Sequence, residues 1–340
     1  MQLCEQSTSI NISTLRRRKA MTSNSTKYVG TSERGLTKEF TFPVSWGLVA
    51  GKTWGDKKNP PIICLHGWLD NCNTFDKLIP LLPKSYYYIT MDFPGHGLSS
   101  HLSKGMYYTE LVICIAIKRL LNYFNIEEVS MIGHSMGGNM ALHFSAIYPD
   151  IVKRVVVIDT FGVFTILEDT LADSLRRWIK DNMQLDDAEP RKEKQYTYEE
   201  AKAKLLGASS HLNDESGKIL LERSTKELEN GKRTFTRDVR NYTLLPIERT
   251  LKTSLKLVEN VRADVLFIEA DNGVIAGVKN MLAKEFSRSL DIFEKFFKSF
   301  KMVNLEGRHH LHLCTPSETA EEITTFFQEH PVHSDILSKL

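Results

Sequence analysis

The sequence lacks a long hydrophobic run and an excess of charge of either sign. Its most apolar stretch, Leu111 to Ile117, ends at Lys118-Arg119, well short of the roughly 20 residues that cross a bilayer. The 340 residues include 44 basic and 42 acidic side chains, so the net charge is +2. Because phosphate binding needs a basic excess or a basic face, this balance argues against nucleic acid as the natural partner. An apolar segment typical of a secretory signal is also missing near the N-terminus.

Cysteines are few and scattered. The five are odd in number, and none forms a Cys-x-x-Cys pair: Cys4, Cys64, Cys72, Cys114 and Cys314. This pattern favours free thiols in a reducing compartment over a disulfide framework. The spacing of Cys, His and Asp matches no zinc site, so we expect neither a metal nor a cofactor.

Short apolar runs alternate with longer helical patterns once the polar stretch 1–36, which we expect to be disordered, has ended. The predicted strands are Pro61–Leu65, Tyr86–Met91, Val129–Ile132, Val155–Ile158, Asp264–Ile268 and Lys301–Leu305. The predicted helices between and after them are Met106–Phe124, Met136–Tyr148, Val278–Ser287 and Pro316–Gln328. Strand–helix alternation implies βαβ units and a mostly parallel sheet flanked by helices.

The middle of the chain has a different pattern. Residues 161–246 are charged and helical, without strand-like runs, and their candidate helices are Leu167–Met183, Tyr198–Ala208, Glu215–Leu228 and Thr236–Leu244. We therefore expect a helical cap, inserted between two halves of one α/β core at 37–160 and 247–328. We expect residues 329–340 to form a C-terminal tail.

A nucleophile motif lies at the third predicted strand. Gly133-His134-Ser135-Met136-Gly137 fits the pattern Gly-x-Ser-x-Gly and stands between a strand and a helix. A tight turn there forces the nucleophile into strained backbone, so flanking glycines are needed to avoid clashes. At a helix N-terminus, the dipole and the free N–H groups favour developing negative charge. The pattern predicts Ser135 as a catalytic nucleophile.

Two backbone N–H groups are expected to form an oxyanion hole. One belongs to Met136, directly after the nucleophile. The other comes from the loop after the first core strand, His66 to Asp70, where Trp68 is the predicted donor. Gly67 would let this backbone approach a substrate closely.

The general base is expected late in the chain, because the order of the triad in this arrangement is Ser, acid, His. His309, His310 and His312 follow the last predicted strand, and His330 stands further on. His309 is nearest to the end of the strand, so we expect it to reach Ser135. The other two are expected to line the loop or to pack beneath it.

The acid has two candidates at strand ends. Asp271 follows the predicted strand Asp264–Ile268, and Asp159 follows the preceding one. Either carboxylate could reach His309. We prefer Asp271 and keep Asp159 as the alternative.

Three stretches together resemble the α/β-hydrolase superfamily in order and spacing. They are Ile63-Cys64-Leu65-His66-Gly67-Trp68-Leu69-Asp70-Asn71, Asp92-Phe93-Pro94-Gly95-His96-Gly97-Leu98-Ser99 and Gly133-His134-Ser135-Met136-Gly137-Gly138. The opening Pro43 to Gly55 and the ending Glu306 to His312 are similar to serine hydrolase-like proteins, including the insect Kraken type. The superfamily often has its catalytic His seven positions before a Pro, as His309 stands before Pro316. In one alignment, Asn272 rather than Asp271 occupies the acid position.

The resemblance implies a serine hydrolase that cleaves a carboxylic ester or thioester. Dehalogenases and epoxide hydrolases with this fold use Asp as nucleophile, and Ser135 argues against both. The alternative is a non-catalytic member that keeps the pocket and binds a small ligand.

The last three residues, Ser338-Lys339-Leu340, match a peroxisomal address that an import receptor reads at a free C-terminus. The rival is the basic stretch Arg16-Arg17-Arg18-Lys19, which is weakly like a mitochondrial transit peptide. We expect a peroxisomal protein, with cytoplasm or mitochondrion as the alternatives.

Overall fold

The computed structural model describes residues 37–163, 168–187, 194–243 and 250–332. The predicted N-terminal disorder and the tripeptide Ser338-Lys339-Leu340 lie outside these ranges. Within them, no helix has the length and the apolar character that a membrane crossing would need.

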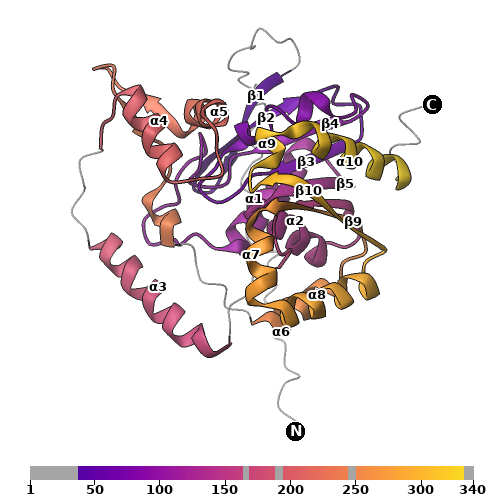
Figure 1. Ribbon diagram of the computed structural model, residues 1–340. Coiled ribbons are helices and arrows are strands. Elements are labelled where there is room, and N and C mark those ends of the chain that lie inside the picture. Colours follow the sequence, from indigo (N-terminus) through magenta and orange to yellow (C-terminus); the bar gives the residue numbers. More distant parts are fainter. Residues whose placement is uncertain (1–36, 164–167, 188–193, 244–249, 333–340) are drawn as a thin grey trace, which may run out of the picture.

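One eight-stranded sheet forms the centre of the molecule (Figure 1), in the order β1-β2-β4-β3-β5-β6-β9-β10. Its strands are β1 Thr37–Val44, β2 Gly47–Trp54, β3 Pro61–Leu65, β4 Tyr87–Met91, β5 Val129–His134, β6 Val152–Ile158, β9 Asp264–Asn272 and β10 Ser299–Arg308. The pairs from β4 to β10 are parallel. The hairpin β1–β2, which the sequence did not predict, is antiparallel and joins the sheet beside β4.

Helices cover both faces of the sheet (Figure 1). Those of the core are α1 Glu110–Phe124, α2 Met136–Ile147, α6 Leu251–Val258, α7 Val274–Met281, α8 Ala283–Phe296, α9 Leu311–Cys314 and α10 Pro316–Glu329. The predicted helix Val278–Ser287 is instead the junction of α7 and α8. Helix α1 begins four residues later than predicted, after Thr109, whose hydroxyl accepts a hydrogen bond from the N–H of Val112.

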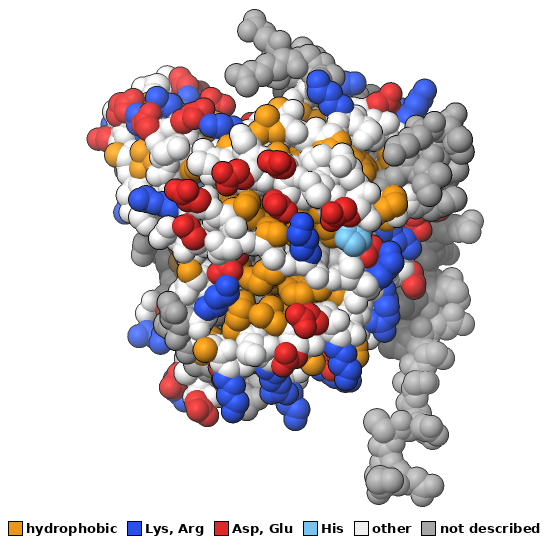
Figure 2. All heavy atoms as spheres, turned by 45° about the vertical axis from the view of Figure 1, so that its right-hand side comes forward, with side chains coloured by type: hydrophobic (Ala, Val, Ile, Leu, Met, Phe, Trp, Pro, Cys, Tyr) orange, Lys and Arg blue, Asp and Glu red, His pale blue; other side chains and the backbone are white. Residues whose placement is uncertain are grey.

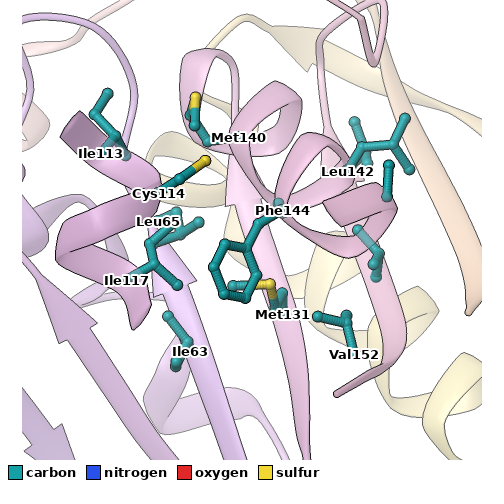
Figure 3. Close-up of a cluster of buried hydrophobic side chains, with 14 of the residues drawn as sticks. Ile63, Leu65, Ile113, Cys114, Ile117, Met131, Met140, Leu142, Phe144 and Val152 are labelled. Atoms are coloured by element: carbon teal, nitrogen blue, oxygen red, sulfur yellow. The ribbon is translucent and has the colours of Figure 1, made fainter. Parts of the chain in front are cut away.

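The strands bury alternate residues on opposite faces, because successive side chains of a strand point in opposite directions. Ile63 and Leu65 of β3 pack with α1 and α2, whereas Ile62 and Cys64 pack with the face that α10 covers. Figure 3 shows the first of these layers, in which side chains of β3, α1, α2 and β5 point toward one another. The outer surface is mixed, with acidic and basic side chains interspersed on the face in Figure 2.

The segment between β6 and β9 contains helices α3 Leu171–Asp186, α4 Tyr198–Gly207 and α5 Asp214–Ser224. It also contains a small hairpin of β7 Thr225–Glu227 and β8 Arg233–Phe235. This hairpin corrects the prediction of a purely helical segment, in which Glu215–Leu228 was a single helix. The predicted helix Thr236–Leu244 is a single 3-10 turn at Val239–Thr243. Three-residue strands are too short to be recognised from side-chain alternation.

Candidate active site

Ser135 lies in a sharp turn between β5 and α2. Its backbone has φ 52° and ψ −119°, a conformation that side chains other than glycine rarely adopt. A Cβ at Gly137 would come within 2.0 Å of the carbonyl oxygen of Leu65, so only glycine allows α2 to approach β3 this closely. The turn therefore has the geometry that the motif predicted, with Ser135 before the first residue of α2.

Asp159, and not Asp271, contacts the predicted base. The Nδ1 atom of His309 lies 2.6 Å from Oδ2 of Asp159, and the carboxylate is fully buried. Asp271 is exposed instead, and its carboxylate accepts hydrogen bonds from Asn272 and from the backbone N–H of Gly307. The structure thus corrects the preference for Asp271 in favour of Asp159, the alternative.

The physical reason lies at the ends of the two strands. Asp159 follows β6 with a positive φ of 45°, and its carboxylate also accepts hydrogen bonds from the backbone N–H groups of Ala270 and Val274. A Cβ at Gly273 would lie 2.3 Å from both carboxylate oxygens, so glycine makes room for them. Strand β9 meanwhile continues through Asp271, where the side chain faces solvent.

The segment after β10 brings His309 beside the turn of Ser135. The backbone carbonyl of His309 lies 2.8 Å from Nε2 of His134, the residue before Ser135. The rings of His134 and His309 are 4.5 Å apart at their centroids. The predicted nucleophile, the predicted base and the alternative acid therefore come together from the ends of β5, β10 and β6.

The predicted oxyanion loop is held by two buried histidines. His66 accepts a hydrogen bond from the backbone N–H of Phe93, and His96 accepts one from that of Leu69. Burial lowers the pKa of His96 to about 3, so its ring stays neutral and can accept this bond. These contacts fix the loop that carries Trp68. The indole of Trp68 is itself half exposed and donates to the carbonyl of Asn241.

Comparison with known proteins identifies the fold and the proteins to which this chain is related. Residues 60–288 match the family model described as the alpha/beta hydrolase fold. A serine hydrolase-like protein of Danio rerio is 38% identical over 307 residues, which cover 88% of this chain and 91% of that protein. Serine hydrolase-like protein 2 of Homo sapiens is 34% identical, with 86% and 95% covered.

The chain belongs to the α/β-hydrolase family, among the serine hydrolase-like proteins.

Solved structures agree with this fold. A hypothetical protein of Pseudomonas aeruginosa PAO1 superimposes with a TM-score of 0.73 at 24% identity, covering 86% of the hydrolase and 98% of that chain. The thioesterase domain of the curacin biosynthetic pathway gives a TM-score of 0.70 at 20% identity, with 84% and 99% covered.

The cap of the hydrolase also reaches the site through a histidine that sequence reasoning missed. His211, between α4 and α5, has its ring 5.6 Å from that of His309 in an edge-on arrangement. Its position is held by the backbone, because Cys314 contacts the carbonyl of His211 and Arg308 donates to that of Ser210. Burial, followed by the neighbouring His309, lowers the pKa of His211. No sequence motif marks this residue.

A second set of side chains lies under the site. The ring of His134 packs against those of His309, His310 and His312, with centroids 4.2 to 4.8 Å apart. Burial lowers the pKa values of His134 and His312 well below the ordinary value, so both are neutral. Asp70, at the end of the oxyanion loop, lies 3.7 Å from His310. Burial alone would raise the pKa of Asp70, but His310, His66 and the backbone N–H of Asn71 together outweigh it and the pKa is lowered.

Proposed function

We propose that this chain is a serine hydrolase that cleaves a carboxylic ester or thioester through an acyl-enzyme at Ser135. The observation that carries the proposal is the contact of 2.6 Å between His309 and the buried carboxylate of Asp159, beside the strained turn of Ser135. In this role the N–H at Nδ1 of His309 donates a hydrogen bond to Asp159, which leaves Nε2 of His309 free to act as general base.

The reaction then takes two steps. Ser135 Oγ attacks the acyl carbon while His309 takes the hydroxyl proton, and His309 returns that proton to the departing alcohol or thiol. A water molecule then attacks the acyl-enzyme by the same route and releases the acid. The backbone N–H groups of Met136 and Trp68 are the expected donors to the oxyanion in both steps. Met136 directly follows Ser135, and Trp68 directly follows Gly67.

We favour ester and thioester substrates because the residues of the site suit acyl transfer and because structural neighbours include such enzymes. A thioesterase domain and an esterase of Mycobacterium tuberculosis have this fold, the latter with a TM-score of 0.60. Those likenesses concern the fold, so the acyl chain is best found by a screen of p-nitrophenyl esters and acyl thioesters of increasing chain length.

A fluorophosphonate probe tests the mechanism directly, because only an activated serine reacts with it. We expect the wild-type chain to be labelled at Ser135 and Ser135→Ala to remain unlabelled. His309→Ala is expected to lose most labelling, and His310→Ala to lose far less. A wild-type chain that stays unlabelled and turns over no ester would favour the alternative, a ligand-binding member without catalysis.

Peroxisomal location remains a proposal that rests on Ser338-Lys339-Leu340 alone. An N-terminally tagged chain is expected to enter peroxisomes, and the same chain without this tripeptide is expected to stay outside. Equal distribution of the two would contradict the proposal.

A further inference from the structure

Three side chains of the kind that bind metals converge under the turn of Ser135. They are Asp70 after β3, His134 at the end of β5, and His310 after β10, and one ligand atom of each lies within 4.8 Å of the other two. We propose that they form a binding site for a divalent transition-metal ion such as Zn²⁺, and that its occupation inhibits the hydrolase. The inhibition rests on the proposed function, whereas the binding site does not.

Each of the three side chains has a buried polar atom that lacks a hydrogen-bond partner among the described residues. These atoms are Oδ2 of Asp70 and the Nδ1 atoms of His134 and His310. Asp70 is 7% exposed and His134 1% exposed, so water does not readily satisfy them. The 3.7 Å between Asp70 and Nε2 of His310 is too long for a hydrogen bond. Because unsatisfied buried polar atoms are costly, three of them on side chains that lie this close together indicate a missing partner.

The surroundings keep these atoms in place without satisfying them. The other ring nitrogen of His134 is already engaged by the backbone carbonyl of His309 at 2.8 Å, which leaves Nδ1 to face the group. A Cβ at Gly67 would come within 3.0 Å of this Nδ1, and glycine keeps that side open. Asp70 accepts a hydrogen bond from the N–H of Asn71 with Oδ1, and so it presents Oδ2.

The chemistry of the donors selects the ion. Two imidazoles and one carboxylate form a set that suits Zn²⁺ with an open fourth position, whereas Mg²⁺ and Ca²⁺ prefer oxygen ligands. Bonds of about 2.0 to 2.2 Å require the three atoms to approach one another by up to an ångström or so. Rotation of the His310 ring and a small shift of its loop can supply that movement.

The same movement explains the inhibition. His134 directly precedes Ser135, and His310 directly follows His309, so an ion that draws the two rings together displaces the backbone of nucleophile and base. A misplacement of about 1 Å at reacting groups costs on the order of 10²-fold in rate. We therefore expect saturating Zn²⁺ to reduce ester hydrolysis by roughly tenfold to a hundredfold, and a chelator to restore it.

Binding is measured first, without reference to activity. The full chain is titrated with Zn²⁺ in competition with a chromophoric chelator, in parallel with Asp70→Asn, His310→Gln and the control His101→Gln, which alters an exposed histidine. We expect one ion per chain, a dissociation constant at least about tenfold higher for Asp70→Asn and His310→Gln, and no change for His101→Gln. Excess Mg²⁺ is expected not to compete. Circular dichroism checks that each variant is folded. If only one of the two ligand variants folds, its dissociation constant for Zn²⁺ alone tests the site.

Inhibition is measured next, as the effect of Zn²⁺ on ester hydrolysis and on fluorophosphonate labelling. Stoichiometric binding without labelling or hydrolysis would support the site and overturn the proposed function. Absent binding, or equal binding by the wild type and both ligand variants, would overturn the site. Inhibition that persists in Asp70→Asn but is lost in His211→Gln would place the ion on His211 and His309, and would also overturn the proposal.

Discussion

Different interactions stabilise the interior of the core and that of the cap. Two apolar layers cover the sheet of the core, and in them strands and helices bury aliphatic and aromatic side chains on both faces. The cap has a small apolar cluster of Ala201, Leu205, Leu220 and Leu221, and Leu313 of the core joins it. Helix α3 buries little beyond Asn182.

Polar contacts also connect the cap to the core. Arg223 of α5 donates to Asp92 at 2.7 Å and to Glu39 at 2.7 Å, and Asn71 donates to the carbonyl of Leu220. Ser135, Asp159 and His309 thus lie at the ends of strands of the central sheet, whereas the cap contacts that sheet through directional polar bonds and a small apolar cluster.

The largest expected effect comes from the core side of the site. Ser135→Ala is expected to lower kcat by about 10⁶, because removal of a triad nucleophile costs this much in other serine hydrolases. The unfolding temperature is expected to stay near that of the wild type, and Ser317→Ala on α10 serves as the control. Ester hydrolysis near the wild-type rate in a folded Ser135→Ala variant would refute the proposed function.

The next effect separates two carboxylates at neighbouring strand ends. Asp159→Asn is expected to lower kcat by roughly 10⁴, because the amide no longer holds the His309 ring in the reactive tautomer. Asp271→Asn, with its exposed side chain, is expected to change kcat little. Steady-state kinetics on both variants decides, and a large loss confined to Asp271→Asn would contradict the geometry.

A third prediction concerns the buried ion pair between cap and core. Arg223→Met leaves the fully buried Asp92 without its cationic partner and is expected to cost about 3 to 5 kcal/mol of unfolding free energy, measured in urea. Burial would raise the pKa of Asp92, but Arg223, His66 and the backbone N–H groups of Leu98 and Cys72 together outweigh it and the pKa is lowered. The stabilisation in the wild type is therefore complete above the ordinary pKa of the carboxyl and is lost as the pH falls through the lowered pKa of the folded state. An unfolding free energy equal to that of the wild type would show that the cap is not held by this pair.

The smallest effect comes from an exposed ion pair across the same boundary. Lys77 lies 2.8 Å from Glu215 of α5, and the carboxylate is 65% exposed. Lys77→Met is expected to change the unfolding free energy by no more than about 1 kcal/mol, because solvent and salt screen such pairs. The same urea titration measures it, and a loss as large as that of Arg223→Met would remove the distinction between buried and exposed anchors.

Much of the core could be predicted because its signals are local. The β-branched runs at Pro61–Leu65 and Val129–Ile132 are strands in the structure, and the helix that begins at Met136 has its predicted first residue. The hairpin β1–β2 was missed because Gly47 to Trp54 mixes glycine, lysine and tryptophan without clear alternation. The cap hairpin β7–β8 was missed because its strands have three residues each.

The sequence by itself determined the turn of Ser135, because strand, glycines and helix start lie within a few consecutive residues and dictate the local backbone. Only the tertiary structure decided which aspartate contacts His309. Asp159 and His309 are 150 positions apart in the sequence, and the direction of a side chain at a strand end depends on the neighbouring strand. The same holds for Asp70, His134 and His310, whose spacing matches no metal motif. They meet because parallel strands end at one edge of the sheet, where residues that are far apart in the sequence lie close together in space.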